Sequence, residues 1–482
     1  MFIGREQELQ FLEDKYTTPG GQLIVLYGRR RIGKTETLRK FCEGKPHIFY
    51  SSREISDYKQ LTAFSERILR AGSPAARYIN AFPDWETAIR GFAELPGEET
   101  RKLLVIDEFP YMCKGNPSIP SILQSLWDEM LKSQNVMIVL CGSSMSFIEK
   151  EILSAENPLY GRATGIYRMN ELPFYDAVKF FPAYSPQDKI LAYSMLGGIP
   201  HYLRQFNPSL SLKENIINNI LTKGCVLYSE VEFLARQELR EPAMYNTLIE
   251  AVALGNTQLN DIYTKTQIDK PKISVYLKNL IELGILEREF SVFSGDKEKA
   301  ASTRGLYSVA DNFFRFWFRF VAVNLSDLET GDAEGVYDHA VQQNLGDFAS
   351  HTFERVCLEF IRRKNRNGEL RFRVAKLGRW WGKAPQTVVS DDGKTKQISV
   401  ETEIDIVATD SSMKNYLLCE CKFRNAKTDF VDLNLLKQKS TIVNQGAEVQ
   451  YMLFSKSGYS EALIAEAVND ESITLYTLAD IV

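Results

Sequence analysis

Eight residues near the start of the chain have the types and spacing of a phosphate-binding loop. Residues 28–35 read GRRRIGKT and match G-x-x-x-x-G-K-[ST] without a mismatch. Glycines let successive backbone N–H groups face a phosphate, and the N-terminus of a following helix adds partial positive charge. Lys34 is expected to contact the β- and γ-phosphates of ATP, and the Thr35 hydroxyl to bind Mg²⁺. The residues expected around the nucleotide are Gly28, Arg29, Arg30, Arg31, Ile32, Gly33, Lys34, Thr35 and Glu36.

The residues on either side of this loop favour the same interpretation. Residues 23–27 are apolar or aromatic, which is enough for a buried strand and too few for a helix. A helix is expected over residues 36–42. The alternative is a glycine-containing turn without a ligand, but a complete motif between a strand and a helix favours ATP binding.

A second apolar stretch ends in two acids. Residues 102–108 read KLLVIDE, so Asp107 and Glu108 lie at the carboxyl end of an expected strand, where open α/β sheets bind ligands. Asp107 suits a role in holding Mg²⁺, and Glu108 suits the base that orients the attacking water. Such acids are otherwise an ordinary solvated strand end. Their pairing with the upstream loop favours the catalytic interpretation.

Two further polar residues are candidates for contact with the γ-phosphate. Ser143 follows a strand expected over residues 136–141 and could sense that group. Arg162, in the segment LYGR, could be an arginine finger in cis or from a neighbouring subunit, or a structural arginine on a loop. Apolar strands separated by helical stretches predict a doubly wound parallel sheet.

The first half of the chain resembles a known family. The loop, the acid pair, LYGR, the opening FIGREQEL and the segment GGIPHYL at residues 197–203 together resemble the archaeal-type ATPase family of the AAA+/STAND group. This resemblance covers roughly residues 1–230. It implies ATP hydrolysis coupled to assembly or to a conformational change, with a P-loop ATPase core at residues 1–170 and a helical lid at 171–238.

Residues 239–325 resemble a winged helix-turn-helix followed by a connector. Helices are expected over residues 244–254, 259–265 and 269–280, and wing strands over 285–293 and 306–309. Lys270, Lys272, Ser274 and Lys278 would lie on the outer face of the recognition helix, where they could read a DNA major groove. The alternative is a protein–protein spacer with a solvated lysine face. The aromatic run at residues 313–320 favours a buried connecting helix over a base-stacking platform.

The C-terminal part contains a hairpin that carries acids. Residues 401–408 and 416–423 read as strands, and a turn symmetric about residues 412–413 places Asp405 opposite Glu420 and Glu403 opposite Lys422. These four would share one face, leaving Ile404, Ile406, Cys419 and Cys421 on the other. Opposed carboxylates repel unless a cation or a proton lies between them. Oxygen ligands beside a lysine suit metal-assisted attack on a phosphodiester.

This arrangement is similar to the PD-(D/E)XK nuclease core, and residues 326–482 resemble the DUF234 domain found with these ATPases. The resemblance matches Asp405, Glu420 and Lys422 to the catalytic motif and Glu354 to the acid of the first helix, with Glu354, Asp405 and Glu420 as ligands of a second divalent metal. It implies a restriction-endonuclease-like α/β/α domain. Isoleucine, not proline, precedes Asp405. The alternative is a charged face in an inert domain.

The composition is that of an ordinary globular protein. The 482 residues carry a net charge of −4, so any nucleic-acid surface must be local. One candidate is the segment 362–383, with nine Lys or Arg and one acid. Seven scattered cysteines indicate a reducing cytoplasm, and the acidic N-terminal segment is not a signal peptide. The chain lacks an apolar run near 18 residues, so no membrane span is expected.

The sequence therefore predicts a multidomain α/β ATPase, which converts ATP and water to ADP and phosphate and is coupled to a metal-dependent, nuclease-like domain that binds nucleic acid. DNA is favoured over RNA as the partner, and self-association through the ATPase domain is a further expectation. The alternative is a STAND-like regulatory or defence switch that binds DNA or a protein without cutting.

Overall fold

A computed structural model describes residues 2–97, 100–300, 305–389, 395–444 and 446–482. The chain divides into two compact units. The first contains Met1–Pro173 with Gly198–His201, and the second contains Phe174–Gly197 with Tyr202–Val482. Each unit is described by itself.

The first unit is built on a five-stranded sheet in which every pair of neighbouring strands is parallel. The strand order is β2 (His47–Ser51), β3 (Lys102–Asp107), β4 (Val136–Gly142), β1 (Gln22–Tyr27) and β5 (Gly165–Arg168). The predicted doubly wound parallel sheet is therefore confirmed. The sequence analysis missed β5, because its four residues alternate between partly buried and exposed and form no apolar run.

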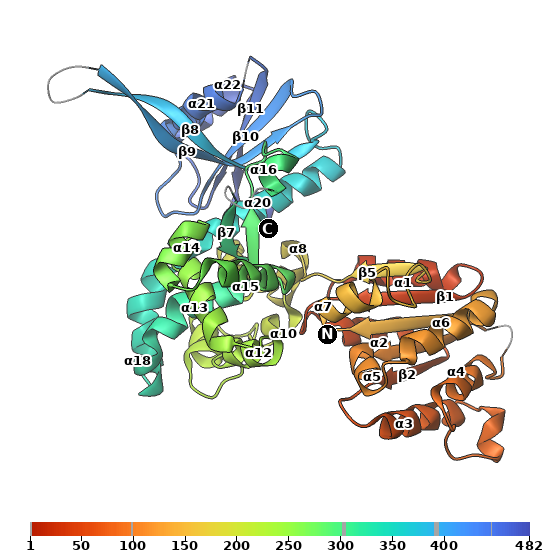
Figure 1. The fold of residues 1–482 in the computed structure, drawn as a ribbon. Helices are drawn as coiled ribbons and strands as arrows, with labels where there is room; N and C mark the ends of the chain where they lie inside the picture. The colour runs from red at the N-terminus through yellow and green to blue at the C-terminus, as the bar shows by residue number, and fades with distance from the viewer. Residues whose placement is uncertain (1, 98–99, 301–304, 390–394, 445) are drawn as a thin grey trace. The chain divides into compact units, whose positions relative to one another are not determined.

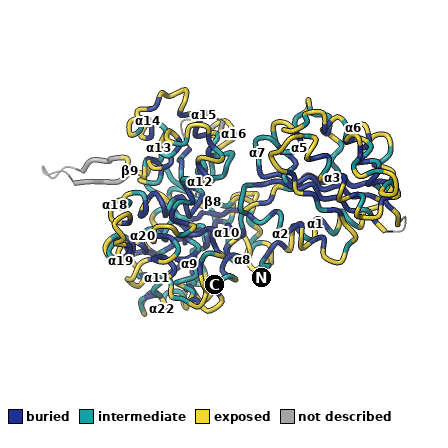
Figure 2. Tube along the Cα trace, turned by 90° about the horizontal axis from the view of Figure 1, so that it is seen from below, coloured by how far each residue is buried: buried dark blue, intermediate teal, exposed yellow. Residues whose placement is uncertain are grey.

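Helices cover both faces of this sheet, which accounts for the continuous apolar character of its central strands. Alternate residues of β1 belong to two different cores: Leu23 and Val25 pack in one, and Ile24 and Leu26 in the other. Figure 2 shows the strands as a buried layer with exposed segments outside it. The helices of this unit are α1 (Glu6–Thr17), α2 (Lys34–Cys42), α3 (Asp57–Arg70), α4 (Trp85–Ala93), α5 (Phe109–Gly115), α6 (Ile119–Glu129) and the short α7 (Met145–Phe147).

The second unit begins with helices whose ends are well capped. The Ser185 side chain accepts a hydrogen bond from the Asp188 backbone at the start of α9 (Pro186–Leu196), and Ser211 forms a capping box with Glu214 at the start of α11 (Leu212–Ile216). These side chains satisfy backbone donors that a helix start leaves unpaired.

Three helices and a hairpin follow in the order that the sequence predicted. They are α13 (Pro242–Ala253), α14 (Leu259–Thr266), α15 (Lys270–Glu282) and the antiparallel pair β6 (Leu286–Glu289) and β7 (Leu306–Val309). One face of α15 is buried and carries Ile273, Tyr276, Leu277 and Leu280. The polar residues expected outside, Lys270, Lys272, Ser274 and Lys278, are all exposed.

The aromatic run forms a buried helical segment, as predicted. It comprises α17 (Asn312–Phe316) and a π-helical turn, Trp317–Val321. The Trp317 indole nitrogen donates a 2.8 Å hydrogen bond to the Tyr228 carbonyl, so even its polar edge is paired. Burial on this scale excludes a base-stacking surface formed by these rings.

The C-terminal part of the second unit is an α/β/α layer structure (Figure 1). Its sheet has the order β12 (Ile473–Thr477), β11 (Glu448–Ser455), β10 (Asn415–Lys422), β9 (Thr395–Thr409) and β8 (Lys376–Val389). The first three strands are parallel and the last three antiparallel. Rings of α20 (Gln342–Arg366) contact Phe423 and Phe454, whereas α21 (Phe430–Val443) packs Leu436 against Leu418. Two further helices are α22 (Glu461–Asn469) and the short α23 (Leu478–Ile481).

The hairpin of β9 and β10 has the predicted register but not the predicted faces. The ladder runs from Tyr416–Thr409 to Cys419–Ile406 with the expected symmetry and ends there, so the predicted pairs Asp405–Glu420 and Glu403–Lys422 are not among its pairs. On the other side of β9, however, Gly378 pairs with Val407 and Trp380 with Ile404, so two residues of β9 lie opposite Arg379 alone. This β-bulge breaks the alternation of side chains. Ile404 therefore lies in the core that contains Leu418, and its predicted place on the face of Cys419 is wrong.

The close packing of Gly198 gives a prediction about the first unit. A Cβ atom there would lie 1.8 Å from the Leu172 carbonyl oxygen, whose residue also donates to the Gly198 carbonyl. Gly198→Ala is expected to destabilise the unit by about 1–3 kcal/mol, because backbone must move. Thermal unfolding measures this. In α20, Gly346→Ala meets no atom within 4 Å and is the matched control, expected to be neutral or stabilising. Equal melting temperatures for both variants would contradict the prediction.

Candidate functional site

The glycine-rich loop joins β1 to α2 in the form that phosphate binding requires. Gly28 and Gly33 have φ angles of 154° and 91°, and a Cβ at Gly28 would lie 2.4 Å from the Met169 carbonyl oxygen. The Lys34 amine donates to the carbonyl oxygens of Gly28 (2.8 Å) and Arg29 (2.9 Å). Burial lowers the pKa of Lys34, and no carboxylate contacts its amine at hydrogen-bond distance among the described residues. A buried ammonium held by carbonyls in a glycine loop fits an anionic phosphate.

The parallel sheet brings the acid pair to this loop. The Thr35 hydroxyl donates a 2.8 Å hydrogen bond to the Asp107 carboxylate, although the two residues are 72 positions apart. Since β3, β4 and β1 are adjacent and parallel, their carboxyl ends lie at one edge. A hydroxyl and a carboxylate are hard oxygen donors, which is the donor type that Mg²⁺ prefers. Asp107 and Thr35 thus fit the metal role that the sequence predicted.

Glu108 lies next to Asp107 in an uncommon backbone conformation. Its φ of 53° is in the left-handed region, which costs free energy for a residue with a side chain. Its carboxylate accepts hydrogen bonds from the Ser143 hydroxyl (2.9 Å) and the Ser143 backbone N–H (3.3 Å). Ser143, predicted to sense a phosphate, therefore contacts Glu108 in this structure. It holds the carboxylate that was predicted to orient water.

Other arginines of the first unit support the loop. Within the loop, Arg30 donates to the Tyr111 hydroxyl at 3.2 Å and Arg31 has a φ of 70°. The sequence analysis missed Arg5, which is buried and donates to the Ile32 carbonyl of the loop at 2.7 Å. Its guanidinium also pairs with Glu8 at 2.7 Å. The spacing of Arg5 and Glu8 within FIGREQEL was the available signal, since i and i+3 residues meet around a helix start.

Arg162 does not lie at the nucleotide loop of its own chain. Its guanidinium donates to Asp128 at 2.6 Å and to the Pro158 carbonyl at 2.8 Å. Thr164, two residues later, donates to the Leu23 carbonyl at the amino end of β1. The chain must return to that end because β5 runs parallel to β1. These contacts match the structural loop arginine that the sequence left open, and an arginine finger supplied to a neighbouring subunit stays a prediction.

The predicted C-terminal residues gather around the bulge in β9. The Asp405 carboxylate accepts a 2.7 Å hydrogen bond from the Cys421 backbone N–H of β10, beyond the last ladder pair. The Lys422 amine donates to one Glu420 oxygen at 2.5 Å, and Lys439 of α21 donates to the other at 3.4 Å. Glu420 and Lys422 of β10 therefore form an ion pair, and Lys439 is a second lysine beside it.

Burial and neighbouring charge disfavour the ionised forms of Glu354 and Asp405. Burial, and then the charge of Asp405, raise the pKa of Glu354 to about 8. Burial, and then the charge of Glu420, raise the pKa of Asp405 to about 6. Within the described ranges, however, no three His, Cys, Asp or Glu residues are arranged to hold a metal ion. The donor chemistry fits a hard cation, but the predicted second metal site is not assembled in this structure.

Arg379 is a further member of this cluster that sequence reasoning missed. It donates to Glu403 at 2.5 Å and lies 3.9 Å from Glu289 of β6, so it joins the hairpin of the three-helix segment to the acid-bearing sheet. Its strand, β8, was not expected, and no sequence signal identified this pairing. Other cations of the segment 362–383 are paired as well, Lys364 with Glu369 and Arg371 with Glu471. With Arg379, these are three of the nine cations in the segment, so its role as a phosphate-binding strip stays a prediction.

A membrane span was not expected, and within the described part of the chain no helix combines the length and apolar character needed to cross a bilayer.

The Walker-type loop, its acid partner and the parallel sheet define a P-loop ATPase domain, followed by a separate α/β domain. A family model described as an ATPase domain predominantly from Archaea matches residues 2–206. DUF234, described as "Archaea bacterial proteins of unknown function", matches residues 317–434. An uncharacterized protein of Methanocaldococcus jannaschii is 32% identical over 428 residues, covering 89% of this chain and 88% of the relative. The chain belongs to this family of archaeal-type ATPases with a C-terminal DUF234 domain.

Other similarities concern the ATPase part or the fold. An uncharacterized ATP-binding protein of the same organism is 53% identical over 45 residues, which is 9% of this chain and 76% of that protein. The Walker-type ATPase of Pyrococcus abyssi has a TM-score of 0.48 at 20% identity, covering 66% of this chain and 96% of that one. The ORC2 protein of Aeropyrum pernix has a TM-score of 0.42 at 14% identity, covering 68% and 95%.

The raised pKa of Glu354 predicts a pH-dependent effect of Glu354→Gln. The pKa of the Glu354 carboxyl rises from 4.5 to about 8 on folding. Its protonated form therefore stabilises the folded state fully below pH 4.5, and this contribution is lost as the pH rises through about 8. Without divalent cations, the variant is expected to be more stable than the unsubstituted protein. The difference should be small near pH 5 and reach about 1–3 kcal/mol near pH 8.

Thermal unfolding at several pH values measures this difference. The exposed Glu401 of the same sheet provides the control Glu401→Gln, which should show no widening gap. A gap for Glu354→Gln that stays constant between pH 5 and pH 8 would contradict the assignment.

Proposed function

We propose that this protein hydrolyses ATP and that its nucleotide state controls a C-terminal domain that acts on nucleic acid. The observation that supports hydrolysis most directly is the 2.8 Å hydrogen bond from Thr35 to Asp107, beside the buried Lys34. A hydroxyl, a carboxylate and an ammonium from distant parts of the chain converge there. This is the donor set that a nucleoside triphosphate with its metal ion requires.

Each residue has a role in the proposed reaction. Lys34 binds the phosphates, and Thr35 with Asp107 holds Mg²⁺, which neutralises negative charge on the β- and γ-phosphates when bound. Glu108 orients the attacking water, and Ser143 positions the Glu108 carboxylate through the hydrogen bond it donates. A neighbouring subunit could supply Arg162, since that residue lies at the other edge of its own sheet. Self-association would then accelerate turnover.

Lys34→Ala tests the hydrolysis step. Loss of this buried cation should reduce ATP turnover by at least about 100-fold, because a charge-assisted contact to the phosphates disappears. Phosphate release from ATP measures the rate. Lys40 lies on the same helix, is exposed and pairs with Glu43, so Lys40→Ala is the matched control. Full turnover in Lys34→Ala would refute the proposed site.

Nucleic acid is the proposed partner of the three-helix segment. Lys270, Lys272 and Lys278 project from the exposed side of α15, whose other side is buried. A helix that follows a short helix and precedes a hairpin suits insertion in a DNA major groove. We infer DNA, not RNA, because an RNA duplex has a major groove too narrow for side chains to read.

For the acid cluster we propose metal-dependent cleavage of a phosphodiester. Glu354, Asp405 and Glu420 would hold a divalent cation, which supplies Lewis-acid assistance when bound. Lys422 would stabilise negative charge on the phosphate. The support is the proximity of carboxylates whose pKa values are raised by burial and by each other, since such a group favours a cation.

A second candidate is a switch that binds DNA or a protein without cutting it. Both oxygens of Glu420 are engaged by lysines, Lys422 and Lys439. Together with the lack of an assembled metal group among the described residues, this favours a domain in which lysines replace the metal. The two candidates share the ATPase and differ only at the acid cluster.

Asp405→Ala separates the two candidates. Plasmid DNA is incubated with the protein, ATP and either Mg²⁺ or Mn²⁺, and nicked or linear products are measured on a gel. A nuclease predicts cleavage by the unsubstituted protein that Asp405→Ala abolishes and that the exposed control Glu401→Ala retains. Absence of cleavage with either metal, accompanied by DNA-stimulated ATP turnover, would refute the nuclease and support the switch.

A further inference from the structure

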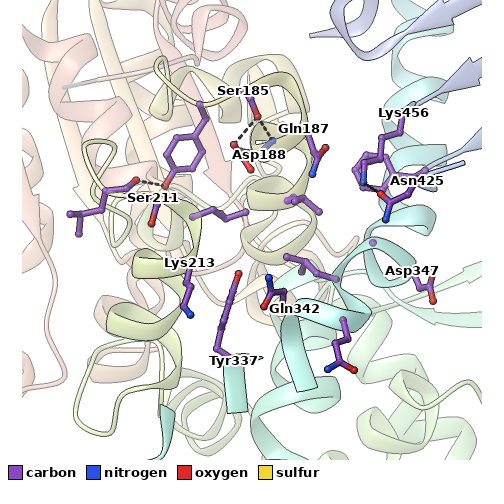
Figure 3. Close-up of a pocket in the computed structure, with 18 of the residues that line it drawn as sticks. Ser185, Gln187, Asp188, Ser211, Lys213, Tyr337, Gln342, Asp347, Asn425 and Lys456 are labelled. Carbon is purple, nitrogen blue, oxygen red and sulfur yellow. Dashed lines mark hydrogen bonds between the residues drawn. The ribbon is translucent and has the colours of Figure 1, made fainter. Parts of the chain in front are cut away.

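The second unit contains a cavity that is separate from the acid cluster. Its volume is about 800 Å³, within the range of small-molecule pockets. Figure 3 shows its walls, which come from α9, from the start of α11, from the start of α20 and from the loops that follow β10 and β11. Five segments of the chain thus line one cavity.

The two strand-end loops are held in place by their own hydrogen bonds. The Lys456 backbone N–H donates to the Lys422 carbonyl at 2.9 Å, and the Ser457 hydroxyl donates to the Arg424 carbonyl at 2.7 Å. Beneath them, the Thr428 hydroxyl donates to the Ser455 hydroxyl at 2.8 Å. Because β10 and β11 are adjacent and parallel, their carboxyl ends form the kind of edge at which α/β sheets bind ligands.

Lys456 gives this wall a positive charge that no acid neutralises. Its amine donates to the Asn425 side-chain oxygen at 2.9 Å, and among the described residues no carboxylate forms an ion pair with it. The other cations of the cavity differ, since Lys213 pairs with Asp338 and Arg424 with Asp432. Burial lowers the pKa of Lys456, which is the effect of partial desolvation without a compensating anion.

The helical walls carry neutral amides together with two carboxylates, Asp188 and Asp347. Gln187 and Gln342 point into the cavity from α9 and α20 in Figure 3. The Asp188 carboxylate is engaged by the Ser185 hydroxyl at 2.7 Å. Side-chain amides can pair with the donor and acceptor edges of a base or with sugar hydroxyls, whereas an apolar ligand would leave them unpaired.

We propose that this cavity binds a phosphate-bearing ligand of nucleotide size, with the phosphate at Lys456 and Asn425 and the polar body against Gln187 and Gln342. The ligand is either a free mononucleotide or the end of a nucleic-acid strand, which share this chemistry. The proposal does not depend on the ATPase or on the acid cluster.

The test uses the full chain carrying Lys34→Ala, because this substitution removes nucleotide binding at the phosphate loop. Calorimetric titration of this variant then measures binding at the cavity. The probes are inorganic phosphate, AMP, GMP, CMP and UMP, and 5′-phosphorylated DNA and RNA trinucleotides. At least one nucleotide or trinucleotide should bind. Adding Lys456→Met should weaken binding by about tenfold or more, as expected for one lost charge-assisted hydrogen bond.

Two further variants complete the test. Lys427 lies in the loop after β10, as Asn425 does, is exposed and does not line the cavity, so Lys427→Met should bind as tightly as the parent. Gln342→Ala, at an exposed position on the opposite wall, should weaken nucleotides but not inorganic phosphate. Tighter binding of a trinucleotide than of every mononucleotide identifies a strand end, and the reverse identifies a free nucleotide.

Two results would overturn the proposal. One is absence of binding by every probe at about 1 mM, a concentration at which even a weak specific site is detectable. The other is equal binding by Lys456→Met and Lys427→Met. Inorganic phosphate that binds as tightly as any nucleotide, with Gln342→Ala unchanged, would overturn the assignment of nucleotide size.

Discussion

A parallel β-sheet places the carboxyl ends of its strands at one edge, and the chemistry of this protein depends on that constraint. In the first unit it brings Thr35, which follows β1, within 2.8 Å of Asp107 at the end of β3. In the second unit it brings together the loops after β10 and β11, which form one wall of the cavity. Buried apolar strands fix the position of this edge, and the polar residues just beyond it can contact a ligand.

The two candidate catalytic sites differ in how far the fold prepares them. At the phosphate loop, the buried Lys34 is held by two carbonyls and the Mg²⁺ donors already touch. At the acid cluster, a bulge removes Asp405 from the regular ladder and lysines occupy Glu420. The first arrangement has its donors in place, whereas the second must exchange lysine contacts before a metal could enter. The ATPase is therefore the better supported activity.

Local patterns in the sequence predicted what depends on local structure. The loop motif, the acid pair and the hairpin register each follow from periodicity and turn symmetry within a few residues. Predictions failed where a distant segment decides the outcome. Ile404 changes face because β8 forces a bulge. The role of Arg162 stayed open in the sequence, because its place at the far edge of the sheet depends on where β5 starts.

Some features had no sequence signal strong enough to find them. Arg379 acts between β6 and β9 from a strand that was not expected, and the cavity is lined by five segments of the chain. Sequence patterns report which residues share a helix face or strand face, but not which distant segments enclose a space. Arg5 was predicted only in part, because its segment was recognised but its contact with the phosphate loop was not.

The measurement that tests the central claim most directly is the Mg²⁺ dependence of ATP binding, measured by calorimetry on the full chain. If Thr35 and Asp107 hold the metal ion, Mg²⁺ should tighten ATP binding by about tenfold or more, and Thr35→Val should remove that gain while metal-free binding persists. An identical Mg²⁺ effect in Thr35→Val, or no Mg²⁺ effect in the unsubstituted protein, would contradict the account.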